Sequence, residues 1–205
     1  MGKAMRVSAR GRHRMNKTRV DMKLKPWTIL SSRLDQSYRV FNLRTDHARS
    51  PRTGESHDFF VMESSPWVNV IPLTPRQDVV LVRQYRHGTR DITLEIPGGL
   101  VEDGDRPMDA ALRELREETG YAAVSAVPLG CVHPNPAIQS NRCYTFLAKD
   151  VYPSGEQQQD EKEDIEVVLQ PLARIPHLIQ EGVITHALVI AAFYRYYMEY
   201  AAGGK

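Results

Sequence analysis

The stretch that decides the fold runs from residue 99 to residue 121 and reads GLVEDGDRPMDAALRELREETGY. Apolar residues recur in it at three- and four-residue steps, which predicts an amphipathic helix. These residues are Met108, Ala111, Leu112 and Leu115. Pro107 suits the first turn, where its missing N–H would have no partner. Gly120 suits the position after the last turn, where the backbone often becomes left-handed. The stretch therefore predicts one helix that is closed by Gly120.

Three glutamates of the predicted helix share one face. Glu114, Glu117 and Glu118 stand at positions i, i+3 and i+4, and like charges at this spacing repel one another. A hard cation such as Mg²⁺ relieves that repulsion, because it prefers carboxylate oxygens. The paired glycines Gly98 and Gly99 lie just ahead and allow close backbone approach to a ligand. Taken by itself, the acidic run is more often a solvated helix face.

The whole segment resembles the Nudix box, whose pattern is glycine, five residues, glutamate, seven residues, then REUxEExGU with U apolar. Every fixed position matches except Asp105, which stands where the family has glutamate. The resemblance implies an α+β fold, the Nudix α/β/α sandwich with a mixed sheet, over about residues 65–200. It also implies that the shorter carboxylate of Asp105 preserves activity, because that position is structural in the family.

The resemblance also implies a metal site and a reaction. Glu114 and Glu118 would bind metal, with Glu117 close by and the carbonyl of Gly98 as a further ligand. The implied ion is Mg²⁺, with Mn²⁺ as a possible substitute. Arg113 would orient the glutamates by ion pairing rather than touch the substrate. The family activates water to attack a phosphorus of a diphosphate, with metal ions holding the water.

Residues outside the box indicate a branch of the family. Residues 81–86 and 94–99 resemble the branch of ADP-ribose pyrophosphatases and nucleoside diphosphate sugar hydrolases. Pro136 lies fifteen residues after Tyr121, where that branch has a proline, although an ordinary loop proline is the alternative. Arg83 and Arg86 are candidates for contacts with the diphosphate, and strand alternation indicates that they do not both face the site. The surroundings of Pro136 leave the preferred sugar open.

The general base is expected in an acidic loop late in the chain, as is frequent in this branch. Residues 160–166 read DEKEDIE. We expect Glu161 to be the base and Glu163 to be the second choice, with Glu117 as the candidate if the base lies elsewhere. A solvated acidic loop is the alternative. For the nucleobase, Trp27 and Trp67 are both candidate stacking residues, although packing in the core is the favoured role for Trp67.

Three regions are expected along the chain. Residues 1–25 carry nine Lys/Arg and one acidic residue and are predicted to be a disordered basic tail. Residues 26–63 form short strands of an antiparallel meander, which is too small for a core of its own. In the resembling branch such a sheet joins two copies in a homodimer. Residues 64–205 form the Nudix domain, whose last helix is expected at 185–200 with Thr185 as its cap. Because this helix is apolar on nearly all sides, it is expected to pack on both sides.

Composition narrows the function further. No window offers about 18 uncharged apolar residues, so no membrane span is expected. The two cysteines and the lack of a secretory signal favour a cytoplasmic protein with reduced thiols. The rest of the chain is acidic, so a nucleic-acid partner is not expected. The sequence therefore predicts a Mg²⁺-dependent hydrolase of ADP-ribose or a related nucleoside diphosphate sugar. A catalytically inactive Nudix-fold sensor is the alternative.

Overall fold

The computed structural model describes residues 24–159, 161 and 164–200. Its centre is a seven-stranded mixed sheet in the order β12-β5-β4-β10-β9, with β6 paired to β5 and β7 paired to β4. Only β4 and β10 run parallel. The strands are β4 (Trp67–Leu73), β5 (Asp78–Arg86), β6 (Asp91–Glu95), β7 (Gly98–Leu100), β9 (Val127–Val132), β10 (Cys143–Lys149) and β12 (Ile165–Pro171).

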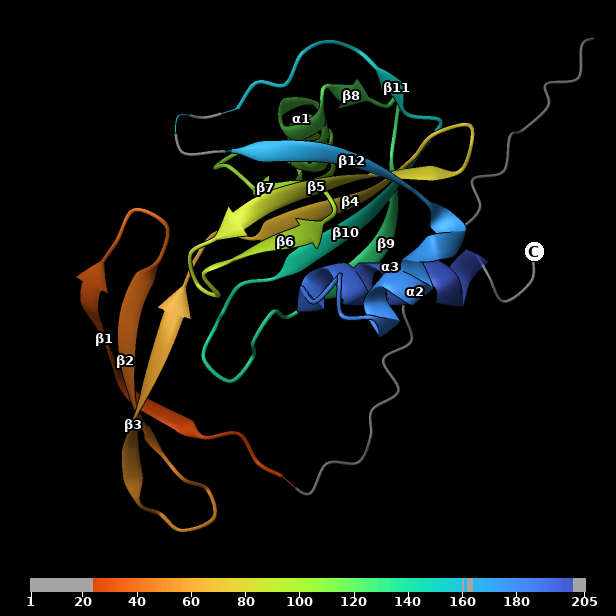
Figure 1. Ribbon diagram of the computed structural model, residues 1–205. Coiled ribbons are helices and arrows are strands. Elements are labelled where there is room, and N and C mark those ends of the chain that lie inside the picture. The colour runs from red at the N-terminus through yellow and green to blue at the C-terminus, as the bar shows by residue number, and fades with distance from the viewer. Residues whose placement is uncertain (1–23, 160, 162–163, 201–205) are drawn as a thin grey trace, which may run out of the picture.

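Helices cover both faces of this sheet (Figure 1). The helix α1 (Pro107–Thr119) lies on one face, and α2 (Ile175–Gln180) and α3 (Ala187–Tyr200) lie on the other, with a short 3₁₀ turn at Leu172–Arg174 before α2. Alternation along the strands sends Val70 and Val80 toward α1, and Ile71 and Leu81 toward the opposite core. These two apolar layers confirm the α/β/α sandwich.

The helix of the box forms where the sequence places it. Pro107 occupies its first position, and Gly120 follows it with φ of 72° and donates its N–H to the carbonyl of Arg116. The glycine loop ahead of the helix adds a short strand instead, because Gly98 and Gly99 pair with β4 in β7. A Cβ on Gly98 would lie 2.3 Å from the Val68 carbonyl oxygen. Only glycine permits that approach.

The N-terminal strands form a separate three-stranded antiparallel sheet, as expected. It consists of β1 (Thr28–Ser37), β2 (Asn42–Arg49) and β3 (Ser56–Glu63), and it projects from the sandwich (Figure 1). Every residue of β1 is exposed. Two backbone hydrogen bonds join Met62 of β3 to the loop before β10, at Ile138 (2.8 Å) and Ser140 (3.1 Å). Residues 1–23 of the predicted tail lie outside the described residues.

Two expectations for the C-terminal helix are wrong. The helix α3 begins at Ala187, and the N–H of Leu188 donates to Nδ1 of His186 at 3.2 Å, so His186 rather than Thr185 provides the cap. The helix is also exposed on one side, at Tyr194 and Met198. A further pair of short strands, β8 (Tyr121–Ala122) and β11 (Tyr152–Pro153), was not expected. Within the described residues, no helix combines the length and apolar character needed to cross a membrane.

Candidate active site

Two glutamates of α1 are held against the glycine strand β7. The carboxylate of Glu118 is 4% exposed, and its Oε2 accepts the N–H of Gly98 at 3.0 Å. The carboxylate of Glu114 lies against Gly99, where an added Cβ would stand 2.5 Å from the Glu114 Cδ. Any larger residue at position 99 would displace that carboxylate. Gly98 and Gly99 therefore position the carboxylates of Glu118 and Glu114.

Arg113 ties the acidic face together. Its Nη1 lies 3.1 Å from Oε1 of Glu114 and 2.9 Å from Oε2 of Glu117. Burial lowers the pKa of Arg113, but the neighbouring glutamates outweigh this and raise it, so the guanidinium stays charged. Asp105 reaches only to 4.0 Å from the Arg113 Nε, which makes no hydrogen bond within the described residues. This geometry agrees with an orienting role for Arg113.

The acidic face fits a divalent cation by its chemistry. Arg113 pairs with two of the three carboxylates on this face, those of Glu114 and Glu117, which leaves an excess of negative charge for a hard cation to offset. In the described part of the chain, no three acidic, histidine or cysteine side chains form a ready-made metal cluster. The reason is that Glu117 turns to Arg113 and Glu118 turns to the Gly98 N–H. Glu114, Glu117, Glu118 and the Gly98 carbonyl are the groups that would hold the ion.

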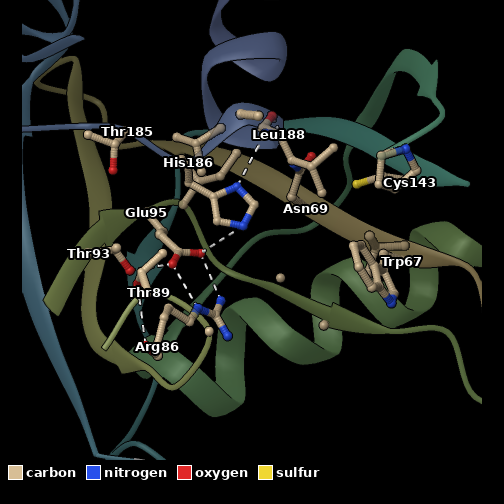
Figure 2. Close-up of a pocket in the computed structure, with 18 of the residues that line it drawn as sticks. Trp67, Asn69, Arg86, Thr89, Thr93, Glu95, Cys143, Thr185, His186 and Leu188 are labelled. Atoms are coloured by element: carbon tan, nitrogen blue, oxygen red, sulfur yellow. Dashed lines mark hydrogen bonds and ion pairs between the residues drawn. The ribbon is translucent and has the colours of Figure 1, made fainter. Parts of the chain in front are cut away.

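A cavity of about 660 Å³ opens beside Gly98 and Gly99. Its walls come from β4, β6, β7, the turn after β5 and the start of α3 (Figure 2). The volume falls in the range of small-molecule sites. Trp67, which the sequence suggested as a core residue, lines this cavity. A ligand in the cavity would therefore extend from the acidic face toward the N-terminal end of α3.

Arg86 lines the cavity and forms an ion pair with the buried carboxylate of Glu95. Its Nε and Nη2 donate to the two oxygens of Glu95, each at 2.8 Å, and Oε1 of Glu95 also accepts the Thr93 hydroxyl at 2.6 Å. Burial raises the pKa of Glu95, but the hydrogen bonds and charge of Arg86 outweigh it, so the pKa is lowered. Glu95 therefore stays ionised and fixes the guanidinium at the cavity wall.

The other predicted substrate-binding residues lie away from this cavity. Arg83 points to the outer surface and pairs with Glu166 of β12 at 2.7 Å. Trp27 belongs to the N-terminal sheet, where its ring lies edge-on to Phe59 at 5.0 Å. Pro136 is exposed in the loop before β10, although Pro134 of the same loop lines the cavity. Among the described residues, Gly98 contacts Glu118 directly, and both Gly98 and Arg86 line the cavity.

Three cavity residues were not predicted from the sequence. Glu95 lies just before the Pro97-Gly98-Gly99 turn, which offered a weak positional signal. Asn69 of β4 is 6% exposed, and its Oδ1 has no hydrogen-bond partner within the described residues. His186 precedes α3 and lines the same cavity. No local pattern marked Asn69 or His186, because their positions depend on how β4 and α3 pack.

The segment that leads from β11 toward Glu161, residues 154–159, arcs over α1 (Figure 1). The side-chain amide of Gln157 donates to the Glu118 carbonyl at 2.6 Å, and the Gln158 N–H donates to the Glu117 carbonyl at 2.8 Å. Gln159 exchanges two hydrogen bonds with the backbone of Ile165. The segment before Glu161 is therefore anchored to the box helix through Gln157 and Gln158, and Gln159 joins it to the first residue of β12. Glu163 lies outside the described residues.

Known proteins share this architecture. The family model described as the NUDIX domain matches residues 64–193. The ADP-ribose pyrophosphatase of Bacillus subtilis is 29% identical over 133 residues, which are 64% of this chain and 71% of that protein. The ADP-sugar pyrophosphatase of Mus musculus is 44% identical over 78 residues, which are 35% of this chain and 36% of that protein.

A solved structure is similar over nearly its whole length. It is described as the crystal structure of an ADP compounds hydrolase, and it superimposes with a TM-score of 0.78 at 25% sequence identity. The match covers 89% of this chain and 98% of that one. The likeness therefore takes in more of the chain than the sandwich alone.

Proposed function

Because the chain belongs to the Nudix family, we propose that it hydrolyses the diphosphate link of ADP-ribose or a related nucleoside diphosphate sugar. One molecule of water adds across the phosphoanhydride, and the products are a nucleoside monophosphate and a sugar phosphate. With ADP-ribose, the products are AMP and ribose 5-phosphate.

One observation carries the proposal. The carboxylates of Glu114 and Glu118 lie against the backbone of Gly99 and Gly98, and these two glycines also line the cavity that contains Arg86. An arginine beside a metal-binding acidic face suits a diphosphate, because guanidinium groups bind phosphate oxygens with charge-assisted hydrogen bonds. The ADP-ribose and ADP-sugar pyrophosphatases among the relatives support the same substrate class.

The family uses divalent metal ions, and we propose Mg²⁺, with Mn²⁺ as a substitute, on Glu114, Glu117, Glu118 and the Gly98 carbonyl. When bound there, such an ion would supply charge neutralisation for the phosphates and lower the pKa of the attacking water. Arg86 orients the diphosphate, and Glu95 holds Arg86 in place. Glu161 accepts the proton of the water. A cytoplasmic location fits an enzyme whose substrates are intracellular nucleotides.

A substrate panel tests the reaction. The purified chain is assayed with Mg²⁺ against ADP-ribose, ADP-glucose, GDP-mannose, NADH and diadenosine polyphosphates, and products are separated by chromatography. We expect the highest kcat/KM on an ADP-sugar, with AMP as a product. Absence of turnover on every diphosphate sugar would contradict the proposed branch. Binding of ADP-ribose without hydrolysis of any compound would instead favour a sensor.

The N-terminal sheet supports a homodimer. Trp27, Ile29 and Phe59 are 42%, 55% and 42% exposed. Ile29 and Phe59 lie on the same face of the sheet, and the Trp27 ring contacts Phe59. A small sheet with exposed apolar side chains gains stability by covering them. We propose that residues 26–63 form the dimer interface and bring Trp27 to the cavity of the partner copy.

We expect the wild-type chain to be a dimer by light scattering. The double variant Ile29→Lys/Phe59→Lys should be a monomer, because it places two desolvated charges in the interface. Val124→Lys is the matched control, since Val124 is 91% exposed and lies outside the sheet. If the double variant is still a dimer, the interface lies elsewhere. If the wild-type chain is a monomer, the proposed interface does not exist.

A further inference from the structure

Two residues that are far apart in the sequence face each other across one wall of the cavity. Glu95 ends β6 and His186 precedes α3 (Figure 2). The Nε2 of His186 lies 3.9 Å from Oε2 of Glu95. That separation is too long for a hydrogen bond. Neither group therefore forms a hydrogen bond with the other, although both line the cavity.

His186 presents a hydrogen-bond donor at this wall. Its Nδ1 lies 3.2 Å from the backbone N–H of Leu188, which can only donate. The Nδ1 must therefore be the unprotonated nitrogen, and the proton of the neutral ring lies on Nε2. Among the described residues, no acceptor lies within hydrogen-bond distance of that Nε2–H. The cap on α3 thus fixes both the tautomer and the direction of the donor.

Glu95 presents an acceptor at the same place. Its Oε1 receives Arg86 Nε and the Thr93 hydroxyl, whereas Oε2 receives only Arg86 Nη2 from the described residues. Each carboxylate oxygen has about two lone-pair sites. One site on Oε2 is therefore unused. Because Glu95 is 3% exposed, leaving this site without a partner in a filled cavity is costly.

An unused donor beside an unused acceptor suits a hydroxyl group. A hydroxyl accepts one hydrogen bond and donates another. An oxygen about 2.8 Å from both atoms would see them at roughly 90°, within the spread of hydroxyl geometry. A phosphate oxygen does not suit this position, because it has no proton to give Glu95 and carries the same charge.

We propose that His186 and Glu95 together bind a ribosyl hydroxyl of the substrate, and that His186 determines specificity for sugar-bearing diphosphates. The inference rests on the proposed hydrolysis of nucleoside diphosphate sugars. The hydroxyl comes either from the sugar phosphate half or from the ribose of the nucleoside, and both sources present the same group. In this proposal His186 contacts a hydroxyl that is remote from the reacting phosphorus, so it determines which substrates bind well and takes no part in the chemical step.

Substrate analogues test the proposal without altering the protein. The wild-type kcat/KM is measured for ADP-ribose, for the methyl ester of ADP, which lacks the distal sugar, and for ADP-ribose built on 2′-deoxy- or 3′-deoxyadenosine. Loss of a hydrogen bond to a charged group predicts a fall of about 10- to 100-fold for the analogue without the bound hydroxyl. The analogue whose kcat/KM falls identifies which part of the substrate supplies the bound hydroxyl. Losses below about threefold for all analogues would overturn the proposal.

Two substitutions at position 186 separate the donor from the helix cap. Asparagine caps helices well but does not reach the position of Nε2, so His186→Asn should lower the preference for the hydroxyl-bearing substrate about tenfold, mainly through KM. His186→Gln keeps an N–H at that reach and should retain more of the preference. His177→Asn is the matched control, because His177 pairs with Glu181 on α2 at 3.1 Å, outside the cavity.

The preference is a ratio of two kcat/KM values within one variant, so a change in the folded fraction cancels. An unchanged preference in His186→Asn would overturn the proposal, because His186 would then not read the hydroxyl. An equal loss of kcat/KM on all substrates would also overturn it, because His186 would then have a structural or phosphate-binding role. If no compound is hydrolysed, the reaction proposed above fails instead. Calorimetric titration of the same analogues then measures the hydroxyl preference as a ratio of Kd values.

Discussion

Glu118→Gln is expected to lower kcat at least about 10³-fold while the fold stays intact. A bound metal contributes several kcal/mol to charge stabilisation in the transition state, and each 1.36 kcal/mol corresponds to about tenfold in rate. The amide has the same size but lacks the charge that a cation requires. Its oxygen can still accept the Gly98 N–H, which Glu118 accepts at 3.0 Å. The substitution should therefore remove metal binding and leave the packing of α1 unchanged.

Thermal unfolding with and without Mg²⁺ gives a readout that does not depend on turnover. Saturating metal at about 100 times its Kd should stabilise the wild type by about 2.7 kcal/mol, and Glu118→Gln should lose this gain. Without metal, the variant should be as stable as the wild type or more so, because one like charge leaves the acidic face. Glu181→Gln is the control, since Glu181 lies on the far side of the sheet after α2. Near wild-type turnover of Glu118→Gln at ordinary Mg²⁺ would refute the metal assignment.

The second large effect is expected at the anchored loop. If Glu161 accepts the proton of the attacking water, Glu161→Gln should lower kcat about 10²–10⁴-fold with little change in KM. Gln157 and Gln159 hold the segment before residue 161 to α1 and to the start of β12. These bonds come from other side chains, so they remain available in the variant.

Glu163→Gln and Glu156→Gln complete this experiment. In an irregular loop, neighbouring acidic residues point in different directions, so we expect a smaller loss at Glu163 than at Glu161. Glu156 is an exposed acidic residue earlier in the same segment, and its substitution should leave kcat unchanged. Equal and mild losses at 161 and 163 would mean that the base lies elsewhere, and Glu117 would then be the candidate to replace.

The sequence by itself determined those features that depend only on residues close together in the chain. The period of Met108, Ala111 and Leu115, together with Pro107 and Gly120, specified the bounds of α1 because helix signals act over a few residues. The i, i+3, i+4 spacing likewise placed Glu114, Glu117 and Glu118 on one face. Apolar runs such as 67–73 gave the central strand β4 with its observed bounds.

Tertiary structure decided which side chains meet. Alternation indicated that Arg83 and Arg86 face opposite ways, but the pairing of Arg86 with buried Glu95 assigned Arg86 to the cavity. The cavity itself joins Asn69, Glu95 and His186 from three elements that lie 26 to 117 residues apart in the chain. Their approach follows from sheet order and from packing of α3 on β4, which no local pattern encodes. The same packing makes His186 the residue that caps α3. This cap orients the ring so that its Nε2–H is a hydrogen-bond donor at the cavity wall, although no sequence signal marked His186.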